Sequence, residues 1–171
     1  MKTVFAILLT LACTSILADE PDSRLAEWEA SAFFNDYLDV YNRRFGHPER
    51  SEQFRSEIST LVNFPVMQSP PTGLPFVTES KEDFGRNFEG FLIGLEKKGV
   101  SELVWKKTSF HALSPNKVLA NNIGHGVDDD GNILYETVSL YLLVKGDDGW
   151  RISLFSPYLL DNELQIQPLL R

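Results

Sequence analysis

Apolar residues in the second half of the chain fall into four runs that are separated by turn residues. The runs cover Glu102–Leu113, Lys117–Val127, Ile133–Lys145 and Trp150–Ser156. Runs of this length between clusters of Gly, Pro, Asn and Asp are typical of strands that follow one another in a sheet. The pattern therefore predicts an antiparallel meander of four strands.

Three segments before the meander place apolar residues three and four positions apart, which is the spacing of one helix face. The first segment runs from near Ser23 to Phe45 and has a strongly aromatic stripe, and the second starts at about Ser51. The third begins with a capping box of Ser80 and Asp83, in which the serine and the acid satisfy free amides of the first turn. It should end at Lys97-Lys98-Gly99. We expect three helices.

Two short segments separate the second helix from the third. Phe64-Pro65-Val66-Met67 favours a brief extended segment, and Ser69-Pro70-Pro71-Thr72-Gly73 has the composition of a turn. The predicted order is two helices, a short extended segment, a third helix and the meander. This order predicts an α+β domain.

Three glycines, Gly85, Gly90 and Gly94, lie inside the third predicted helix. Each weakens a helix by roughly 1 kcal/mol relative to alanine, so a packing partner is expected to come close to them. The alternative is that they are tolerated surface glycines. On the same helix, Phe88 and Leu92 are expected to pack into the concave face of the sheet.

The first eighteen residues have the pattern of a secretory signal peptide. Lys2 precedes the apolar run Val4–Ala12, and a small residue, Ala18, ends the segment. The run is shorter than the roughly 20 apolar residues that cross a bilayer, so we expect no transmembrane segment and a periplasmic or secreted protein. A lipoprotein site at Cys13 is the alternative, although Thr10 stands where such sites usually have an aliphatic residue. Cleavage after Ala18 would remove the only cysteine, and with it any disulfide or cysteine metal ligand.

The chain is acidic, with 24 acidic against 16 basic residues and a net charge of −8. Its basic clusters are no longer than Arg43-Arg44 and Lys106-Lys107, so the sequence argues against a nucleic-acid partner. About 150 residues remain after the leader, enough for one core. The expected organisation is a signal peptide over residues 1–18, a single domain over residues 19–157 and an apolar tail over residues 158–171.

The tail is too apolar for an ordinary solvated terminus. Leu164 and Ile166 alternate with Gln165 and Gln167, which suits an added edge strand or an arm that lies over a second copy in a homodimer. Alternatively, the tail covers the pocket mouth or sheet edge of its own domain. The sequence leaves both interpretations open.

Five segments carry a resemblance to a known family: Tyr41-Asn42-Arg43-Arg44, Asn63-Phe64-Pro65-Val66, Lys81–Lys98, Leu142-Leu143-Val144 and Gly149-Trp150-Arg151-Ile152. In order and spacing they resemble the SnoaL-like branch of the nuclear transport factor 2-like superfamily, over roughly Ala26 to Pro157. The resemblance implies an α+β cone, in which a strongly curved antiparallel sheet wraps around about three N-terminal helices and encloses an apolar pocket.

The superfamily includes ketosteroid isomerases, dehydratases, epoxide hydrolases and polyketide cyclases, together with transport and assembly domains that catalyse nothing. The fold alone therefore does not decide the function. The enzymes place an Asp–His or Asp–Arg–Asn set in the cone, and neither set maps onto this sequence residue by residue.

Alternation along Ile133–Val144 separates two kinds of side chain. Glu136 shares a face with aliphatic residues, whereas the other face carries Tyr135, Thr137, Ser139 and Tyr141. If the next loop pairs Val127 with Ile133, the neighbours across the hairpin are Gly124 with Glu136, Asn122 with Val138, and His125 with Tyr135. A slip of one residue would change every one of these pairs.

Three residues are catalytic candidates. A carboxylate among aliphatic side chains, such as Glu136, has its charged form disfavoured and can exchange a proton near neutral pH. His125 could act as a general base or as a pocket hydrogen-bond donor, and His111 is the third candidate. The alternative for each is a solvent-exposed position near a strand end or turn. Candidate pocket residues are Tyr37, Tyr41, Phe88, Trp105, Asn122 and Tyr141, although aromatic residues at helical spacing also form ordinary cores.

The loop Asp128-Asp129-Asp130-Gly131-Asn132 resembles the front of a calcium loop. With Gly131 at the sixth position, Gly126 falls where the first aspartate belongs and Thr137 where the bidentate glutamate belongs. We therefore expect a hairpin turn, no metal site and no cofactor.

Two classes of function remain open. The first is an exported, non-catalytic domain that binds a small apolar ligand or a partner chain. The second is a cofactor-independent isomerase, dehydratase or cyclase that uses a pocket carboxylate or histidine. An acid–histidine pair that converges in the pocket would favour the enzyme, and an apolar pocket would favour binding. We favour the non-catalytic domain.

Overall fold

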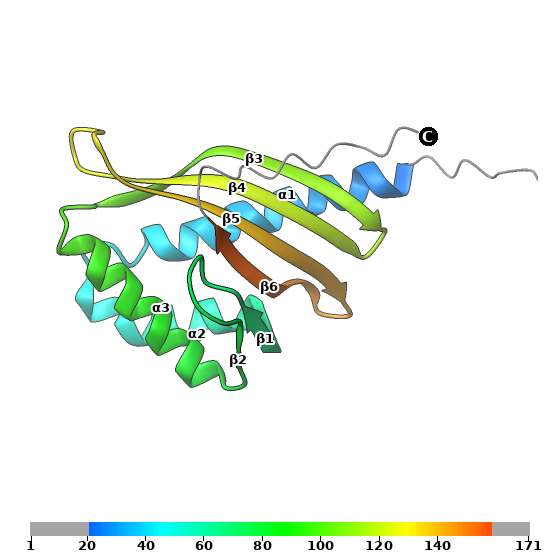
Figure 1. The fold of residues 1–171 in the computed structure, drawn as a ribbon, viewed down its shortest axis with the longest axis horizontal. Coiled ribbons are helices and arrows are strands. Elements are labelled where there is room, and N and C mark those ends of the chain that lie inside the picture. The colour runs from blue at the N-terminus through cyan, green and yellow to red at the C-terminus, as the bar shows by residue number, and fades with distance from the viewer. Residues whose placement is uncertain (1–20, 159–171) are drawn as a thin grey trace, which may run out of the picture.

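A computed structural model describes residues 21–158 of the protein, and Figure 1 shows their arrangement. The predicted signal peptide and all but the first residue of the predicted tail lie outside this range. The helices are α1 (Pro21–Asn42), α2 (Ser51–Thr60) and α3 (Lys81–Glu96), with a short 3-10 helix, η1 (Pro48–Arg50), before α2. The strands are β1 (Val62–Gln68), β2 (Phe76–Thr78), β3 (Glu102–Ser114), β4 (Lys117–Val127), β5 (Ile133–Gly146) and β6 (Gly149–Tyr158). None of the described helices is long and apolar enough to span a bilayer.

The six described strands form one curved sheet in the order β2-β1-β6-β5-β4-β3. Strands β3 to β6 pair antiparallel with their neighbours in chain order, which confirms the predicted meander. Strand β1 adds to the sheet beside β6 and runs parallel to it. Strand β2, which the sequence did not predict, pairs antiparallel with β1 and forms the edge.

Helix α1 lies across the concave face of the sheet, behind the strands in Figure 1. Its fully buried Phe34 stacks on Trp105 of β3 with ring centroids 4.9 Å apart. The same ring meets Phe110 and Tyr141 edge to face, at 5.9 and 4.9 Å. Such aromatic pairs add about 0.5–1.5 kcal/mol beyond the area they bury. The predicted aromatic stripe is therefore the face of α1 that packs against the sheet.

Helix α3 begins as the sequence predicted. The Asp83 amide donates to the Ser80 Oγ at 3.0 Å, and Ser80 has the extended backbone of an N-cap residue. Phe88 and Leu92 of this helix are buried, and the Phe88 ring lies 5.8 Å from that of Phe155 on β6. Both residues therefore belong to the core between α3 and the sheet.

Glycines in α3 play different roles. A Cβ atom added to Gly85 would lie 2.8 Å from the carbonyl oxygen of Arg55 on α2, so the two helix backbones touch here. A Cβ atom on Gly90 or Gly94 would meet nothing within 4 Å. The expected close approach is confirmed for Gly85 and was wrong for the other two.

A cluster of charged residues, with Arg44 buried at its centre, connects the three helices. Arg44, only 2% exposed, follows α1, and its Nη1 lies 3.1 Å from Oε1 of Glu96 on α3. Its Nη2 lies 3.7 Å from Oε1 of Glu89, which also pairs with Arg55 of α2 at 2.6 Å. The Arg44 Nε donates to the Ser51 Oγ at 3.2 Å. Because each buried charge has a partner, the helices keep one relative position.

Substitution of Gly85 and Gly90 by alanine separates close packing from helix propensity. G85A inserts a methyl group against the backbone of α2, and we expect a net loss of about 1–2 kcal/mol in the free energy of unfolding. G90A, on the exposed side of the same helix, should instead gain roughly 0.5–1 kcal/mol, because alanine favours the helix. Urea denaturation of the two variants measures both effects. A gain for G85A would contradict the close contact.

Candidate functional site

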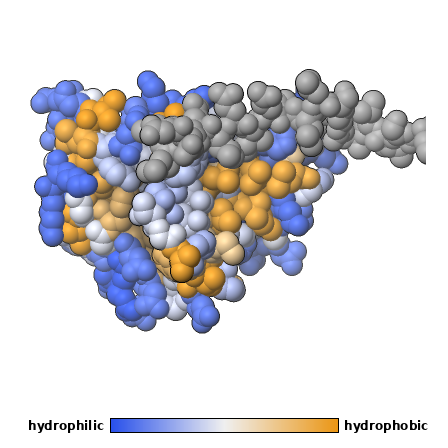
Figure 2. Space-filling model, in the orientation of Figure 1, coloured by the Kyte–Doolittle hydropathy of each residue, from blue (hydrophilic) through white to orange (hydrophobic). Residues whose placement is uncertain are grey.

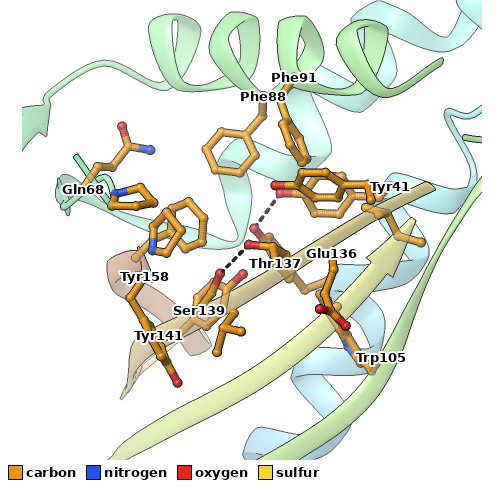
Figure 3. A pocket seen from close by; sticks show the side chains of 18 of the residues that line it. Tyr41, Gln68, Phe88, Phe91, Trp105, Glu136, Thr137, Ser139, Tyr141 and Tyr158 are labelled. Carbon is orange, nitrogen blue, oxygen red and sulfur yellow. Dashed lines mark hydrogen bonds between the residues drawn. The ribbon is translucent and has the colours of Figure 1, made fainter. Parts of the chain in front are cut away.

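A cavity of about 570 Å³ lies between α3, the end of α1 and the concave side of β5. Figure 3 shows Phe88 and Phe91 extending from α3 over it. This volume is in the range of about 300–1,000 Å³ that is typical of small-molecule sites. The main lining residues are Tyr37 and Tyr41 of α1, Phe88 and Phe91 of α3, Leu103 and Trp105 of β3, Tyr135, Glu136, Thr137, Ser139 and Tyr141 of β5, Gln68 of β1, Phe76 of β2 and Phe155 and Tyr158 of β6.

A group of tyrosine hydroxyls supplies much of the polarity inside. The hydroxyls of Tyr37 and Tyr41 lie 2.6 Å apart in a hydrogen bond, drawn as a dashed line in Figure 3. The ring of Tyr141 lies 6.0 Å from that of Tyr37. Burial is the main cause that raises the pKa of each of the three phenols well above its ordinary value, and charge repulsion from a neighbouring phenolate adds to it. All three are therefore neutral hydrogen-bonding groups at physiological pH.

Hydroxyls of β5 form a second polar region. Thr137 and Ser139 point to the same side of the strand, and their Oγ1 and Oγ atoms lie 3.5 Å apart. In register, Thr137 lies opposite Gly124 of β4 and Ser139 opposite Asn122. Hydroxyls both donate and accept, so this strip can bind either kind of neutral polar atom.

Gly124 allows Trp105 to form a wall of the cavity. A Cβ atom at Gly124 would lie 3.1 Å from Cζ3 of the Trp105 ring and 3.4 Å from Cγ2 of Thr137. The indole Nε1 donates to the backbone carbonyl of Phe34 at 3.3 Å, which fixes the ring against α1. A larger residue at position 124 would displace this ring.

The cavity opens between α3 and the β1–β2 region. Lining residues Phe76 and Phe91 are 48% and 37% exposed there, and Leu74 in the loop is 86% exposed. Figure 2 shows apolar side chains on the surface near these strands and over the outer face of the sheet. The rim of the opening, like its interior, is therefore largely apolar.

The acid–histidine pair exists, but on the other face of the sheet. His125 Nε2 lies 2.6 Å from Glu136 Oε2, and the two residues are opposite each other in the β4–β5 ladder. Gly124 and Thr137, their neighbours, point into the cavity, so alternation directs the His125 and Glu136 side chains to the convex side, and Glu136, unlike His125, also borders the cavity. His111 of β3, opposite Leu119, also belongs to the convex side.

The expected register of this hairpin was wrong by one residue. Val127 does pair with Ile133, but Leu134 is left over as a bulge, and Gly126 then pairs with Tyr135. His125 consequently meets Glu136 instead of Tyr135, and Gly124 meets Thr137 instead of Glu136. Bulges of this kind depend on the local twist of the paired strands, which a single sequence does not reveal.

Most of the pocket residues predicted from sequence lie around the cavity: Tyr37, Tyr41, Phe88, Trp105 and Tyr141 line it. Asn122 lies on the concave face beside Ser139 but is not part of the lining. Sequence reasoning missed Gln68 and Phe155, because they reach the cavity only through the pairing of β1 with β6. The sequence analysis had placed Thr137 and Ser139 on the same face of the strand as Tyr141. Because Tyr141 was a predicted pocket residue, this shared face could have identified Thr137 and Ser139 as lining residues.

The sequence matches a known protein family. The profile of the family described as NTF2-like protein (DUF6841) matches residues 26–159. Among curated proteins, none matches this chain.

Several solved structures share the fold. A domain of unknown function with a cystatin-like fold from Nostoc punctiforme is 15% identical, with a TM-score of 0.56 over 82% of this chain and 80% of that chain. A protein from Catenulispora acidiphila, solved in complex with S-DNPA, is 13% identical, with a TM-score of 0.56 over 79% and 93%. A ketosteroid isomerase-like protein from Erwinia carotovora is 13% identical, with a TM-score of 0.51 over 83% and 97%. At these identities the similarity shows the fold alone.

The buried phenols predict a loss of stability at alkaline pH. The unfolded chain releases phenolic protons near pH 10, whereas the raised pKa values keep Tyr37, Tyr41 and Tyr141 protonated in the folded protein. Their contribution is complete below about pH 10 and falls as the pH rises, by up to about 1.4 kcal/mol per pH unit for each phenol. Urea titrations from about pH 9 to 11 should show a shallower decline for Tyr37→Phe than for the wild type. Equal slopes would contradict the burial of this hydroxyl as a neutral group.

Proposed function

The chain belongs to this family of NTF2-like proteins, and we propose that it is an exported domain that binds a small, neutral, largely apolar molecule in its cavity without catalysing a reaction. The observation that carries the proposal is the aromatic character of the lining, in which the acid Glu136 is hydrogen-bonded to His125. Aromatic rings supply most of the walls, and the hydroxyls of Tyr37, Tyr41 and Tyr141 supply polar contacts without charge. Cavities of this kind bind ligands by apolar burial, and a few polar groups fix the orientation.

The placement of the ionisable candidates supports binding over catalysis. A cofactor-independent isomerase or lyase needs an acid or base within hydrogen-bond reach of its substrate. His125, Glu136 and His111 belong to the convex side of the sheet, and the first two form a hydrogen-bonded pair with each other. Of the three residues that suggested an enzyme, His125 and His111 are therefore not part of the lining, and Glu136, which borders the cavity, has its carboxylate hydrogen-bonded to His125.

Binding of naphthalene derivatives to the mature chain from Asp19 tests the proposal. Neutral 2-acetylnaphthalene should bind, and anionic 2-naphthoate should bind at least about tenfold more weakly, because its charge would be buried without a partner. Isothermal titration calorimetry measures both affinities. Ser139→Leu, which fills the floor of the cavity, should weaken the neutral probe at least about tenfold.

Ser156→Leu is the matched control for this substitution. Ser156 pairs with Leu140, so it lies on the convex side of the neighbouring strand, and the affinity should stay unchanged. Absence of binding by the neutral probe, or equal binding of the anion, would contradict the proposal.

Export is a separate part of the proposal and has its own test. It rests on Lys2, the apolar run Val4–Ala12 and the small residue Ala18. Mass spectrometry of the periplasmic or secreted fraction should find an N-terminus at or near Asp19. An intact Met1 in that fraction would refute cleavage, and a diacylglycerol on Cys13 would establish the lipoprotein alternative.

A further inference from the structure

A buried amide beside the cavity lacks hydrogen bonds. Asn122 is 1% exposed, and among the residues that the structure describes it is the one whose buried side-chain nitrogen and oxygen both have no partner. Buried polar groups in proteins nearly always have a partner, which can be another residue, a water or a ligand. The folded protein thus keeps two costly unsatisfied atoms at this position.

The position of Asn122 directs its amide toward the side of the sheet that holds the ligand cavity. On β4, Ala120 lies opposite the lining residue Tyr141, and Gly124 lies opposite the lining residue Thr137. Asn122 lies between them on the same face and is opposite Ser139, which also lines the cavity. Its neighbour Asn121 points the other way, and there its Oδ1 accepts from the Tyr158 hydroxyl at 2.7 Å.

An asparagine amide presents an acceptor and two donors in one plane. A ketone can accept from it but cannot donate, and a carboxylate would in addition bring a negative charge into a cavity whose lining, within the described part of the chain, has an acid, Glu136, and no Lys or Arg. A carboxamide or a lactam presents a donor and an acceptor side by side, so it can satisfy both atoms of Asn122 at once. The hydroxyls of Ser139 and Thr137 can complete either contact.

We propose that Asn122, with Ser139 and Thr137, forms the polar anchor of the cavity, and that the ligand carries a neutral group with an adjacent donor and acceptor, such as a carboxamide or lactam. This inference rests on the proposed function and specifies the ligand class of the same site. The amide lies behind the cavity surface, so contact with a ligand requires side chains around Ser139 to change rotamer, a common adjustment on binding.

The proposal predicts opposite effects of one substitution on stability and on recognition. Asn122→Leu keeps a similar shape and removes both unsatisfied atoms, so the Tm should rise by at least about 2 °C. The same variant should lose the ability to distinguish an amide from a ketone. A residue that only supports the fold would not produce this combination.

The test compares naphthalene-2-carboxamide with 2-acetylnaphthalene, which has the same ring and carbonyl but no N–H donor. Calorimetry on the mature wild-type chain should show at least about tenfold tighter binding of the carboxamide. Asn122→Leu should bind the two probes with equal affinity. Asn63→Leu, the same substitution on β1, where the side chain donates to the Ser153 Oγ outside the cavity lining, should keep the preference and lower the Tm. If Asn122→Leu fails to fold, Asn122→Ala removes the same amide for the binding comparison.

The outcomes separate this inference from the proposed function. If both probes bind the wild type equally, or if Asn122→Leu retains the preference, the polar anchor is refuted while the cavity remains a binding site. A fall in Tm for Asn122→Leu would show that the amide already has a partner in the free protein and would also refute the anchor. If neither probe binds, the proposed function fails, and the anchor fails with it.

Discussion

The packing of one straight helix against a strongly curved sheet determines the rest of the structure. Helix α1 contacts the concave face through Phe34. The ring of Phe34 meets Trp105 and Phe110 of β3 and Tyr141 of β5, so the contact spans the width of three strands. A straight rod cannot fill a concave surface along its whole width, so space remains beside α1 near Tyr41. The cavity is this unfilled part of the core, closed above by α3.

The second condition for the cavity is that α3 does not collapse onto β5. The Arg44 cluster holds α3 through Glu89 and Glu96, and the contact at Gly85 sets its distance from α2. A buried pair of charges loses several kcal/mol when one partner is removed, so the helix cannot move without breaking a costly arrangement. The charged residues between the helices thus preserve the cavity on the other side of α3.

Sequence reasoning succeeded where the determinants are local. The capping box of Ser80 placed the start of α3, and the turns at Ser114–Asn116 and Asp128–Asn132 bounded β4 at its observed residues. It failed where partners are distant or where one residue shifts a register. The parallel pairing of β1 with β6 joins segments about ninety residues apart, as the bond from Asn63 to Ser153 shows. The bulge at Leu134 and the unsatisfied amide of Asn122 emerge only when the strands are assembled.

The bulge at Leu134 also bears on how such a domain could diversify. Directly opposed residues of an antiparallel pair share a face, so the one extra residue decides that Thr137, and not Glu136, shares the face of Gly124. If Leu134 paired with Gly126 instead of bulging, Glu136 would lie opposite Gly124, and a carboxylate would replace the Thr137 hydroxyl on this face with no substitution at any lining position. In this fold, a change of strand register by a single residue is therefore an evolutionary route between a ligand-binding pocket and an acidic active site.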